Sequence, residues 1–559
     1  MRSKIEDILR FAINNAYKKG NLKTKPKIIP INIEIPNRSE HGHFSTNIAM
    51  GLASKENKAP RQIASIILDN IKDKDSIVEK IDIAGPGFIN FWIKKGAWLK
   101  RLYEILEKQE EYGRQDIGKG KKILIEFVSA NPTGPLHVGH ARGAALGDTL
   151  FRIMEFCGYK VTREFYINDA GQQIRLLGKS IFSRFKQFVD PDYPFPDDGY
   201  HGSYIVELAK RISKNIDLNK MDKEEAIEFC AQKGKEIMLE QIKKDLSDFG
   251  VEFDVWFSEK SLYESGLLKK ALNNMHKKGL LYEKDNALWI RTSQFGDDKD
   301  RVVKKSDGQF TYFASDIAYH INKRERGFNQ AINIWGADHH GYIPRLKAAL
   351  ICQGIPKDWL KIMLIQLVKL WKDGKEVKMS KRSGKFVTFR ELMDEVGTDA
   401  MRFVFLTKSH DSTLDFDIDL VKRQDSENPV YYVQYAHARI CSIFRKAESE
   451  GIFFKMPQKE ELDFLQLPEE IELIRNISEF PYILKEIVAF LEPHRLTYYL
   501  TSLSAIFHRY FNLGTNIPEN RVISKNKQLT MIRLALLKAV KIVIYNGLRL
   551  LGVNAPERM

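Results

Sequence analysis

Apolar positions in the middle of the chain alternate between short strand-like runs and longer helical stripes. The run Ile123 to Val128 precedes a loop containing Pro and Gly, and helical periodicity then extends from about Gly139 to Cys157. Gly158 is typical of a helix stop, and a second strand-like run begins at Tyr159. This order predicts the βαβ unit of a doubly wound parallel sheet.

The sheet is expected to resume after a polar insertion. Within the insertion, Asp222 and Glu225 form a predicted capping box ahead of a long amphipathic helix. The strands expected beyond the insertion are Ala287 to Ile290, Phe310 to Ile317, Ala331 to Trp335 and Ile362 to Leu370. We therefore predict a Rossmann-like α/β domain over residues 119–415, with an insertion near residues 180–250.

The two flanking regions predict different architectures. Residues 1–118 contain an amphipathic first helix, an extended run from Lys27 to Ile35 and a strand from Ile89 to Ile93, which together predict a small α+β domain. From residue 416 to residue 559 the apolar stripes have almost only helical spacing. They are Tyr431 to Phe444, Ile471 to Leu491, Leu496 to Phe511 and Leu529 to Leu551. An all-α helical bundle is expected there.

Composition narrows the class of protein. With 559 residues, of which 43% are apolar and 29% charged, the chain has the make-up of a soluble protein of several domains. Its net charge of +15 favours a polyanionic partner such as nucleic acid. The basic excess of residues 1–118 fits a nucleic-acid surface or a solvated face equally well. Because its four cysteines form no CxxC pair and it has no stretch of 18 apolar residues, we expect a cytoplasmic protein that does not enter a membrane.

The strongest local motif is His137-Val138-Gly139-His140, which follows a predicted strand and opens a predicted helix. Its two imidazoles stand three residues apart on one face of the first helical turn, where backbone donors and the helix dipole favour an anion. Gly139 has no side chain, so a base or a sugar could approach the backbone closely. We predict that a triphosphate binds here. The alternative is a surface or metal-binding histidine pair, although no HExxH pattern or third ligand lies nearby.

A basic segment about 240 residues later is the second motif. It consists of Lys378, Met379, Ser380, Lys381 and Arg382. Its ammonium groups could neutralise the charge that builds on a leaving pyrophosphate, whereas alone the segment could be a solvated lysine cluster. Because both motifs follow strands of the expected sheet, they should meet at one crevice. ATP is the expected ligand, with Mg²⁺ accompanying it and no dedicated metal site in the protein.

With these two motifs the chain resembles the class I aminoacyl-tRNA synthetases, and longer strings make it similar to the arginyl-tRNA synthetase family in particular. These strings are Glu40 to Asn47, Glu126 to Pro135, Tyr166 to Gly171, Tyr431 to Arg439 and Leu548 to Met559. The resemblance covers nearly the whole chain. It implies that ATP, L-arginine and tRNA(Arg) are the substrates, that residues 1–118 contact the tRNA, and that residues 416–559 bind the anticodon. It also implies a monomer that needs tRNA for efficient activation of arginine.

The resemblance also implies roles for individual residues. The phosphates of ATP would be bound by His137, Gly139, His140, Lys378, Met379, Ser380 and Lys381, of which the two histidines and the two lysines would be catalytic. Arginine would be bound by Asn131 at its backbone end and by Tyr312, Asp316 and Glu259 elsewhere, with Glu126 and Asp338 as weaker candidates. Such a substrate presents a planar cation with five donors, which carboxylates can match. Tyr431, Tyr435 and Arg439 would bind tRNA, since aromatic side chains stack on unpaired bases.

The expected reaction has two steps. The carboxylate of arginine attacks the α-phosphorus of ATP and pyrophosphate leaves; a ribose hydroxyl of the terminal adenosine of tRNA then attacks the adenylate and AMP leaves.

Three alternatives to this function are open. The chain could be a class I synthetase for another amino acid, a non-catalytic tRNA-binding protein built on the same frame, or a nucleotidyltransferase that makes a small metabolite. The basic all-α region of the chain argues against the last of these.

Overall fold

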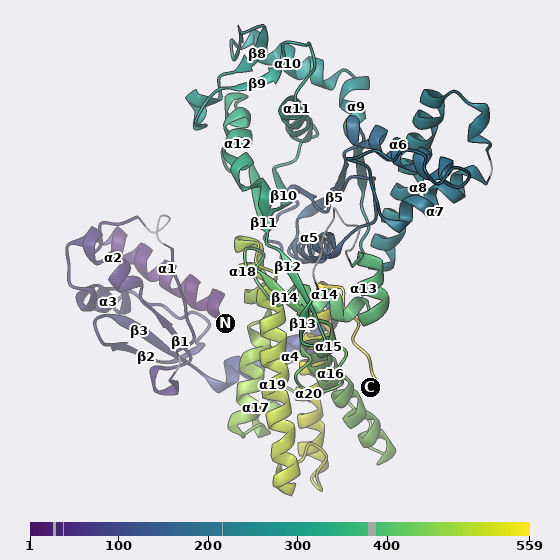
Figure 1. The fold of residues 1–559 in the computed structure, drawn as a ribbon. Helices are drawn as coiled ribbons and strands as arrows, with labels where there is room; N and C mark the ends of the chain where they lie inside the picture. Colours follow the sequence, from purple (N-terminus) through teal and green to yellow (C-terminus); the bar gives the residue numbers. More distant parts are fainter. Residues whose placement is uncertain (26–29, 37, 215, 378–386) are drawn as a thin grey trace.

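A five-stranded parallel sheet forms the centre of the molecule. The computed structural model describes residues 1–559 except 26–29, 37, 215 and 378–386. The strand order is β11 (Leu360–Ile365), β10 (Gln330–Gly336), β4 (Lys122–Glu126), β5 (Lys160–Ile167) and β6 (Val255–Ser258). All neighbouring strands run parallel. The helix α5 (Val138–Phe156) connects β4 to β5 and packs on the sheet (Figure 1), which confirms the predicted βαβ unit.

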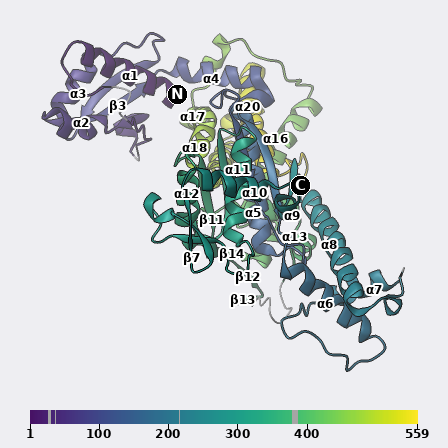
Figure 2. The same ribbon diagram turned by 90° about the horizontal axis from the view of Figure 1, so that it is seen from above.

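The first insertion is a helical module with its own apolar core. It contains α6 (Gln172–Lys186), α7 (Ser203–Ser213) and the long α8 (Lys223–Asp248). The Asp222 half of the predicted capping box is confirmed, because its carboxylate accepts hydrogen bonds from the backbone N–H groups of Glu224 and Glu225, each at 2.9 Å. Among the described residues, no return bond from the side chain of Glu225 is seen at this N-terminus. Figures 1 and 2 show this module and the N-terminal domain on opposite sides of the molecule.

A second module lies between β6 and β10. It consists of a three-stranded antiparallel sheet with the helices around it. The strands are β7 (Leu281–Lys284), β8 (Ala287–Ile290) and β9 (Arg301–Lys304). The helices within this range are α9 (Glu259–Glu264), α10 (Leu267–Lys277) and α11 (Tyr312–Glu325), and α12 (Ile343–Cys352), which follows β10, packs against them. The predicted strand Ala287 to Ile290 therefore exists, but it belongs to this sheet instead of the parallel one.

The predicted strand Phe310 to Ile317 is wrong, because helix α11 begins at Tyr312. The hydroxyl of Thr311 caps this helix by accepting from the backbone N–H of Ala314 at 3.3 Å. The single strand expected from Ile362 to Leu370 is also wrong. The chain leaves the parallel sheet after Ile365 and re-pairs as β12 (Val368–Lys372) in a different sheet.

That smaller sheet has the order β13 (Lys375–Glu376), β12 and β14 (Leu414–Asp417). It lies next to three short helices, which are α13 (Phe389–Val396), α14 (Thr398–Phe405) and α15 (Ile418–Val421). The basic motif from Lys378 to Arg382 lies outside the described residues. By chain order it follows β13, and so it does not follow a strand of the parallel sheet as we expected.

The N-terminal region is an α+β domain, as predicted. It contains α1 (Arg2–Lys18), β1 (Phe44–Thr46), α2 (Ile48–Glu56), α3 (Pro60–Leu68), β2 (Val78–Ala84), β3 (Phe88–Ile93) and the connecting helix α4 (Lys95–Lys108). In the run expected to be extended from Lys27 to Ile35, the described part includes a bridge between Glu34 and Ser45. Strand β2 was not predicted, because its residues are mostly exposed or half-buried and show no clear alternation.

The C-terminal region is an all-α bundle. Its helices are α16 (Pro429–Ser449), α17 (Pro468–Ser478), α18 (Phe480–Phe490), α19 (His494–Asn516) and α20 (Lys527–Leu551). The stripe Ile471 to Leu491 forms two helices rather than one, since the chain turns at Glu479 and Pro481 lies in the first turn of α18.

Short 3-10 helices occur in all parts of the described chain. They are Ser39–His41, Gln109–Glu111, Leu218–Lys220, Thr292–Phe295, Ala337–Tyr342, Glu460–Phe464 and Pro518–Asn520.

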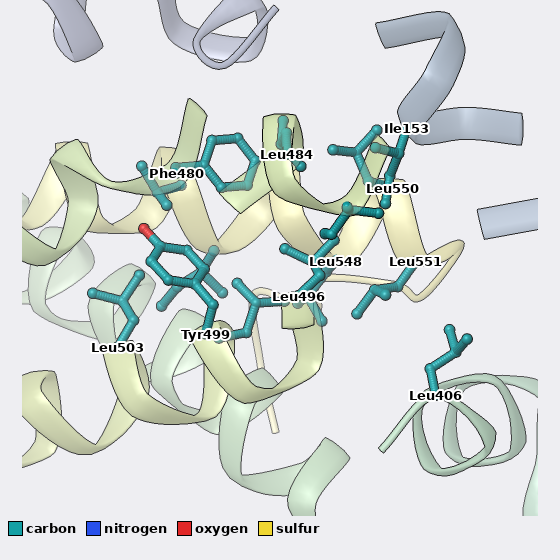
Figure 3. Packing of buried hydrophobic residues seen from close by; sticks show 14 of the residues in the cluster. Ile153, Leu406, Phe480, Leu484, Leu496, Tyr499, Leu503, Leu548, Leu550 and Leu551 are labelled. Atoms are coloured by element: carbon teal, nitrogen blue, oxygen red, sulfur yellow. The ribbon is translucent and has the colours of Figure 1, made fainter. Parts of the chain in front are cut away.

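The core of the bundle continues into the parallel-sheet domain. Figure 3 shows Leu548 and Leu550 of α20 beside Leu484 of α18, with Ile153 of α5 close to Leu550. All four side chains are buried. The helix that follows the HxGH motif is therefore packed directly against the C-terminal bundle. Among the helices of the described part of the chain, none is both long and apolar enough for a membrane span.

Candidate active site

The HxGH turn lies at the carboxyl edge of β4 and forms the N-terminus of α5. His137 is the N-cap, and its Nδ1 accepts a hydrogen bond from the backbone N–H of Gly139 at 3.1 Å. In return, Nδ1 of His140 accepts from the backbone N–H of His137 at 3.1 Å. The two rings are stacked with their centroids 3.7 Å apart. Since Nδ1 accepts in both rings, a neutral imidazole carries its proton on Nε2, which suits donation to an anionic oxygen.

A side chain at residue 139 would crowd this pair of rings. A Cβ atom at residue 139 would lie 3.0 Å from Cε1 of His137, which is closer than ordinary contact. The sequence predicted this turn correctly as the start of a helix. Its spacing of three residues suffices to bring both imidazoles to one face of the first turn.

The chain beyond the undescribed segment 378–386 returns to the same turn. Thr388 forms an antiparallel bridge with His137, and the backbone N–H of Phe389 donates to the carbonyl of Leu136 at 2.8 Å. Thr388 also caps α13 in a capping box with Glu391. Residues 378–386 are thus followed directly by a strand-like contact with the HxGH motif.

Two carboxyl groups lie together in the second module: Glu259 is buried and Asp316 is half-buried. Glu259 begins α9 directly after β6, and Asp316 lies one turn into α11. We call these two residues the acid pair. Burial, reinforced by the charge of Asp316, raises the pKa of the Glu259 carboxyl to about 7. Burial likewise raises the pKa of Asp316 to about 7, although a hydrogen bond from the hydroxyl of Tyr342 opposes this shift.

Two neighbouring acids form ion pairs, and the charge of Lys323 also acts on Asp316. Lys235 forms an ion pair with Asp169 at 3.6 Å, and Lys323 forms one with Glu126. Within the described part of the chain, neither member of the acid pair has an ion pair. A cationic ligand would favour the ionised form of both carboxyls, because an opposite charge nearby lowers a carboxyl pKa.

Glu126 lies near Asp316 and belongs to a buried polar network. Its carboxylate accepts from Nζ of Lys323 and from Oγ of Ser129, the latter at 3.2 Å. Lys323 also donates to Oδ1 of Asn333 at 3.0 Å. Asn333 in turn contacts the ring of His320, 2.9 Å away. The charge of Glu126 is therefore already balanced by the protein itself.

Three further residues were predicted to bind arginine, namely Tyr312, Asn131 and Asp338. Tyr312 is 64% exposed at the start of α11, one turn before Asp316 and on the same face. Asn131 donates to Oε1 of Gln173 at 2.6 Å. The side chain of Asp338 is 84% exposed in the 3-10 helix Ala337–Tyr342 and does not join the acid pair. The described residues include no cluster of His, Cys, Asp and Glu that could hold a metal ion.

Sequence reasoning missed two residues that shape the site. Tyr342 donates to Asp316, and Asp169 accepts from Oγ of Ser258 at 2.8 Å beside the acid pair. Asp169 lies within the string Tyr166 to Gly171, which carried the family resemblance, and so a signal for it existed. No local pattern marks Tyr342, because its contact with Asp316 spans 26 residues.

A concave region in the C-terminal bundle contains two of the predicted tRNA contacts. It has a volume of about 690 Å³ and its lining includes Tyr435, Arg439 and Phe511. The guanidinium of Arg439 lies over the rings of Tyr435 and Phe511, 4.4 and 4.7 Å from their centroids. Tyr431 stacks on Tyr435 at 5.7 Å. Four more basic residues line the cavity, namely Arg445, Lys446, Arg521 and Arg558. Such a basic and aromatic surface suits a nucleic acid with unpaired bases.

Comparison with known proteins identifies three parts of the chain. Three family models match, described as the arginyl tRNA synthetase N terminal domain (residues 3–93), the class I (R) tRNA synthetase catalytic domain (residues 101–418) and the DALR anticodon binding domain (residues 433–559). An arginine–tRNA ligase of Desulfosudis oleivorans is 48% identical over all of both chains. One of Bacillus subtilis is 45% identical over 99% of both chains.

A solved structure shows the same fold. The arginyl-tRNA synthetase of Thermus thermophilus matches 98% of this chain and 99% of its own, with a TM-score of 0.78 and 23% sequence identity. The predicted architecture, a Rossmann-like domain between an α+β domain and an all-α bundle, is thereby confirmed.

Proposed function

Because the chain belongs to the arginyl-tRNA synthetase family, we propose that it activates L-arginine with ATP and transfers it to tRNA(Arg), releasing pyrophosphate and then AMP. One observation supports this function above the others. Glu259, which is buried, and Asp316, which is half-buried, form an acid pair without an ion pair of its own in the described structure, next to the edge of the sheet where the HxGH turn lies. A guanidinium supplies a charge and hydrogen-bond donors that suit two carboxylates.

The acid pair would bind the guanidinium end of arginine. Tyr312, exposed and one turn from Asp316, would cover the aliphatic part of the substrate, and Asn131 would bind the backbone end. Glu126 would act indirectly, since its ion pair with Lys323 fixes the wall behind Asp316. Asp338 is exposed and would contribute to arginine binding only from the edge of this site.

The HxGH turn would bind the phosphates of ATP. Nε2 of His137 and Nε2 of His140 would donate to phosphate oxygens, while Gly139 leaves the backbone accessible to the nucleotide. Lys378, Met379, Ser380 and Lys381 would complete this site. Their assignment rests on the sequence, since they lie outside the described residues. Mg²⁺ would accompany ATP and be bound by its phosphates and by water.

The chemistry needs no covalent enzyme intermediate. A carboxylate oxygen of arginine forms a bond to the α-phosphorus of ATP. At the same time, the bond between the α-phosphorus and the oxygen that leaves with pyrophosphate breaks. The imidazoles and lysines stabilise the negative charge that develops on the phosphates. In the second step, a ribose hydroxyl of the terminal adenosine of tRNA attacks the carbonyl carbon of the adenylate. The hydroxyl loses its proton, the acyl–phosphate bond breaks, and AMP leaves.

The tRNA would contact both ends of the chain. The cavity lined by Tyr435 and Arg439 would take an unpaired anticodon base, with Tyr431 extending the aromatic surface. In this scheme, residues 1–118 contact the body of the tRNA, residues 119–415 carry out catalysis and residues 416–559 read the anticodon. That the enzyme acts as a monomer in the cytoplasm stays a prediction.

Incorporation of each labelled amino acid into total tRNA tests this function directly. The expected result is charging with arginine alone, together with pyrophosphate exchange that depends on added tRNA. Charging with a different amino acid would contradict the assignment of the acid pair. Binding of tRNA without any charging would favour a non-catalytic protein. The variant Asp316→Asn is the matched control, because it removes one charge from the acid pair and leaves the HxGH turn intact.

A further inference from the structure

Arg142, a buried arginine in the helix of the HxGH turn, has partners that the reaction scheme above does not explain. It lies two residues after His140 and is only 1% exposed. Its Nη1 donates to the carbonyls of Gln366 and Ser412, both at 2.9 Å. Its Nη2 donates to the carbonyl of Ser409 at 2.8 Å. Two residues along an α-helix correspond to about 200° of rotation, so Arg142 points away from the face that carries His140.

The three carbonyls lie just before the first residues of two neighbouring strands, β12 and β14. Gln366 lies between β11 of the parallel sheet and β12 of the smaller sheet. Ser409 and Ser412 lie between α14 and β14. Strands β12 and β14 pair in parallel from Val368 and Leu414 onward. One guanidinium thus joins α5 to the point where both strands of the smaller sheet begin.

The charge of Arg142 makes a purely packing role a poor explanation. Within the described structure its hydrogen-bond partners are neutral carbonyls. Burial lowers its pKa to about 10, although the charge of Asp411 opposes this shift, and the guanidinium stays protonated at neutral pH. Burying a cation in this way is unfavourable compared with an apolar side chain of similar volume. What an apolar side chain cannot supply is a rigid fork of donors to backbone groups on two separate segments.

We propose that Arg142 is a positioning residue for adenylate formation. It fixes the smaller sheet against the helix whose first turn carries His137 and His140. The backbone bridge between Thr388 and His137 fixes the other side of the same turn. The HxGH turn is therefore held between two structures that are distant in the sequence. This role rests on the proposed function, because the step that it serves is the attack on the α-phosphorus of ATP.

The test compares Arg142→Met and Arg142→Lys with the control Arg402→Lys. Arg402 is equally buried and also contacts α5, through Asp148, but its carbonyl partners are Phe249 and Leu551. The measurements are kcat and KM in tRNA-dependent pyrophosphate exchange, together with the thermal midpoint of unfolding. We expect Arg142→Met to lower kcat about 10- to 100-fold, since small displacements of catalytic groups cost that much.

The expected pattern separates positioning from stability. For Arg142→Met, KM for arginine should stay within about twofold of the wild type, because the acid pair comes from other elements. Arg142→Lys should recover part of kcat, as it keeps the charge and can reach a single carbonyl. Arg402→Lys should lower the thermal midpoint and leave kcat at 25 °C unchanged. A folded Arg142→Met protein with wild-type kcat overturns the proposal, and so does an equal loss of kcat in Arg402→Lys. If the wild type itself shows no exchange with arginine, the proposed function fails instead.

Discussion

Arginine binding should become much weaker as the pH falls from 8 to 6. Both members of the acid pair have a pKa of about 7 in the absence of arginine, whereas the guanidinium of the substrate stays charged throughout this range. A protonated carboxyl cannot pair with the cation. Substrate binding must therefore deprotonate the acid pair, and the measured affinity reflects the fraction of protein in which the pair is ionised.

The size of the effect follows from this pKa. Between pH 8 and pH 6 the ionised fraction of one carboxyl with a pKa near 7 falls from about 0.9 to about 0.09. If one carboxylate is required, the dissociation constant of arginine rises about tenfold; if both are required, it rises about 100-fold. At pH 6 each required carboxyl should release about 0.9 proton on binding.

Isothermal titration calorimetry of arginine at pH 6, 7 and 8 measures both quantities. Repeating each titration in two buffers with different ionisation enthalpies gives the number of protons released. The variant Asp316→Asn should show a shallower pH dependence, because only Glu259 then titrates. Citrulline, which replaces the guanidinium with a neutral group, is the matched ligand control and should bind with little dependence on pH. A dissociation constant for arginine that stays constant from pH 6 to pH 8, without proton release, would refute the reasoning.

Three further predictions concern stability. Without arginine, thermal stability should fall as pH rises from about 4 to above 7. The raised pKa values mean that the folded acid pair holds more protons than the unfolded chain in that window. The thermal shift caused by saturating arginine should therefore be larger at pH 8 than at pH 6, and equal shifts would contradict this. Lys323→Met should destabilise the protein by about 3–5 kcal/mol, since it leaves the carboxylate of Glu126 buried without its partner; an unchanged urea unfolding curve would show that this ion pair is unimportant. Gly147→Ala should cost about 1–3 kcal/mol, because the new Cβ would lie 2.3 Å from Cγ of the buried Phe127. Gly143→Ala on the same helix is its control: the Cβ there meets only an ordinary contact at 3.5 Å, and the variant should be neutral or more stable in the same unfolding measurement.

Local patterns in the sequence were enough to predict the parts of the site that lie within one element. The HxGH turn is an example: a strand, a loop and a helix N-terminus follow one another directly, and a spacing of three residues brings His137 and His140 together. The amphipathic helix after Asp222 and most helices of the C-terminal bundle were predicted for the same reason. The periodicity of apolar residues reports which face of an element is buried, and it depends only on near neighbours in the chain.

Local patterns failed where a segment's partner lies far away in the sequence. The segment from Phe310 to Ile317 has enough apolar and aromatic residues for a strand, yet the cap at Thr311 and packing in the second module make it a helix. The strand from Ala287 to Ile290 was found, but its sheet was not, because hydrogen-bonded neighbours are chosen by the tertiary fold. Strand β12 leaves the parallel sheet for the same reason.

The sequence predicted one part of the chemistry of the site, and the other part depended on the tertiary structure. The sequence by itself indicated the family, and it predicted the two motifs that we propose for phosphate binding and the acids that we propose for arginine binding. Only the tertiary structure decided that Glu126 is neutralised by Lys323, that Asp338 is exposed, and that the acid pair forms no ion pair among the described residues. A carboxyl acquires its pKa from burial and from charges contributed by distant segments, and neither of these is a property of its neighbours along the chain.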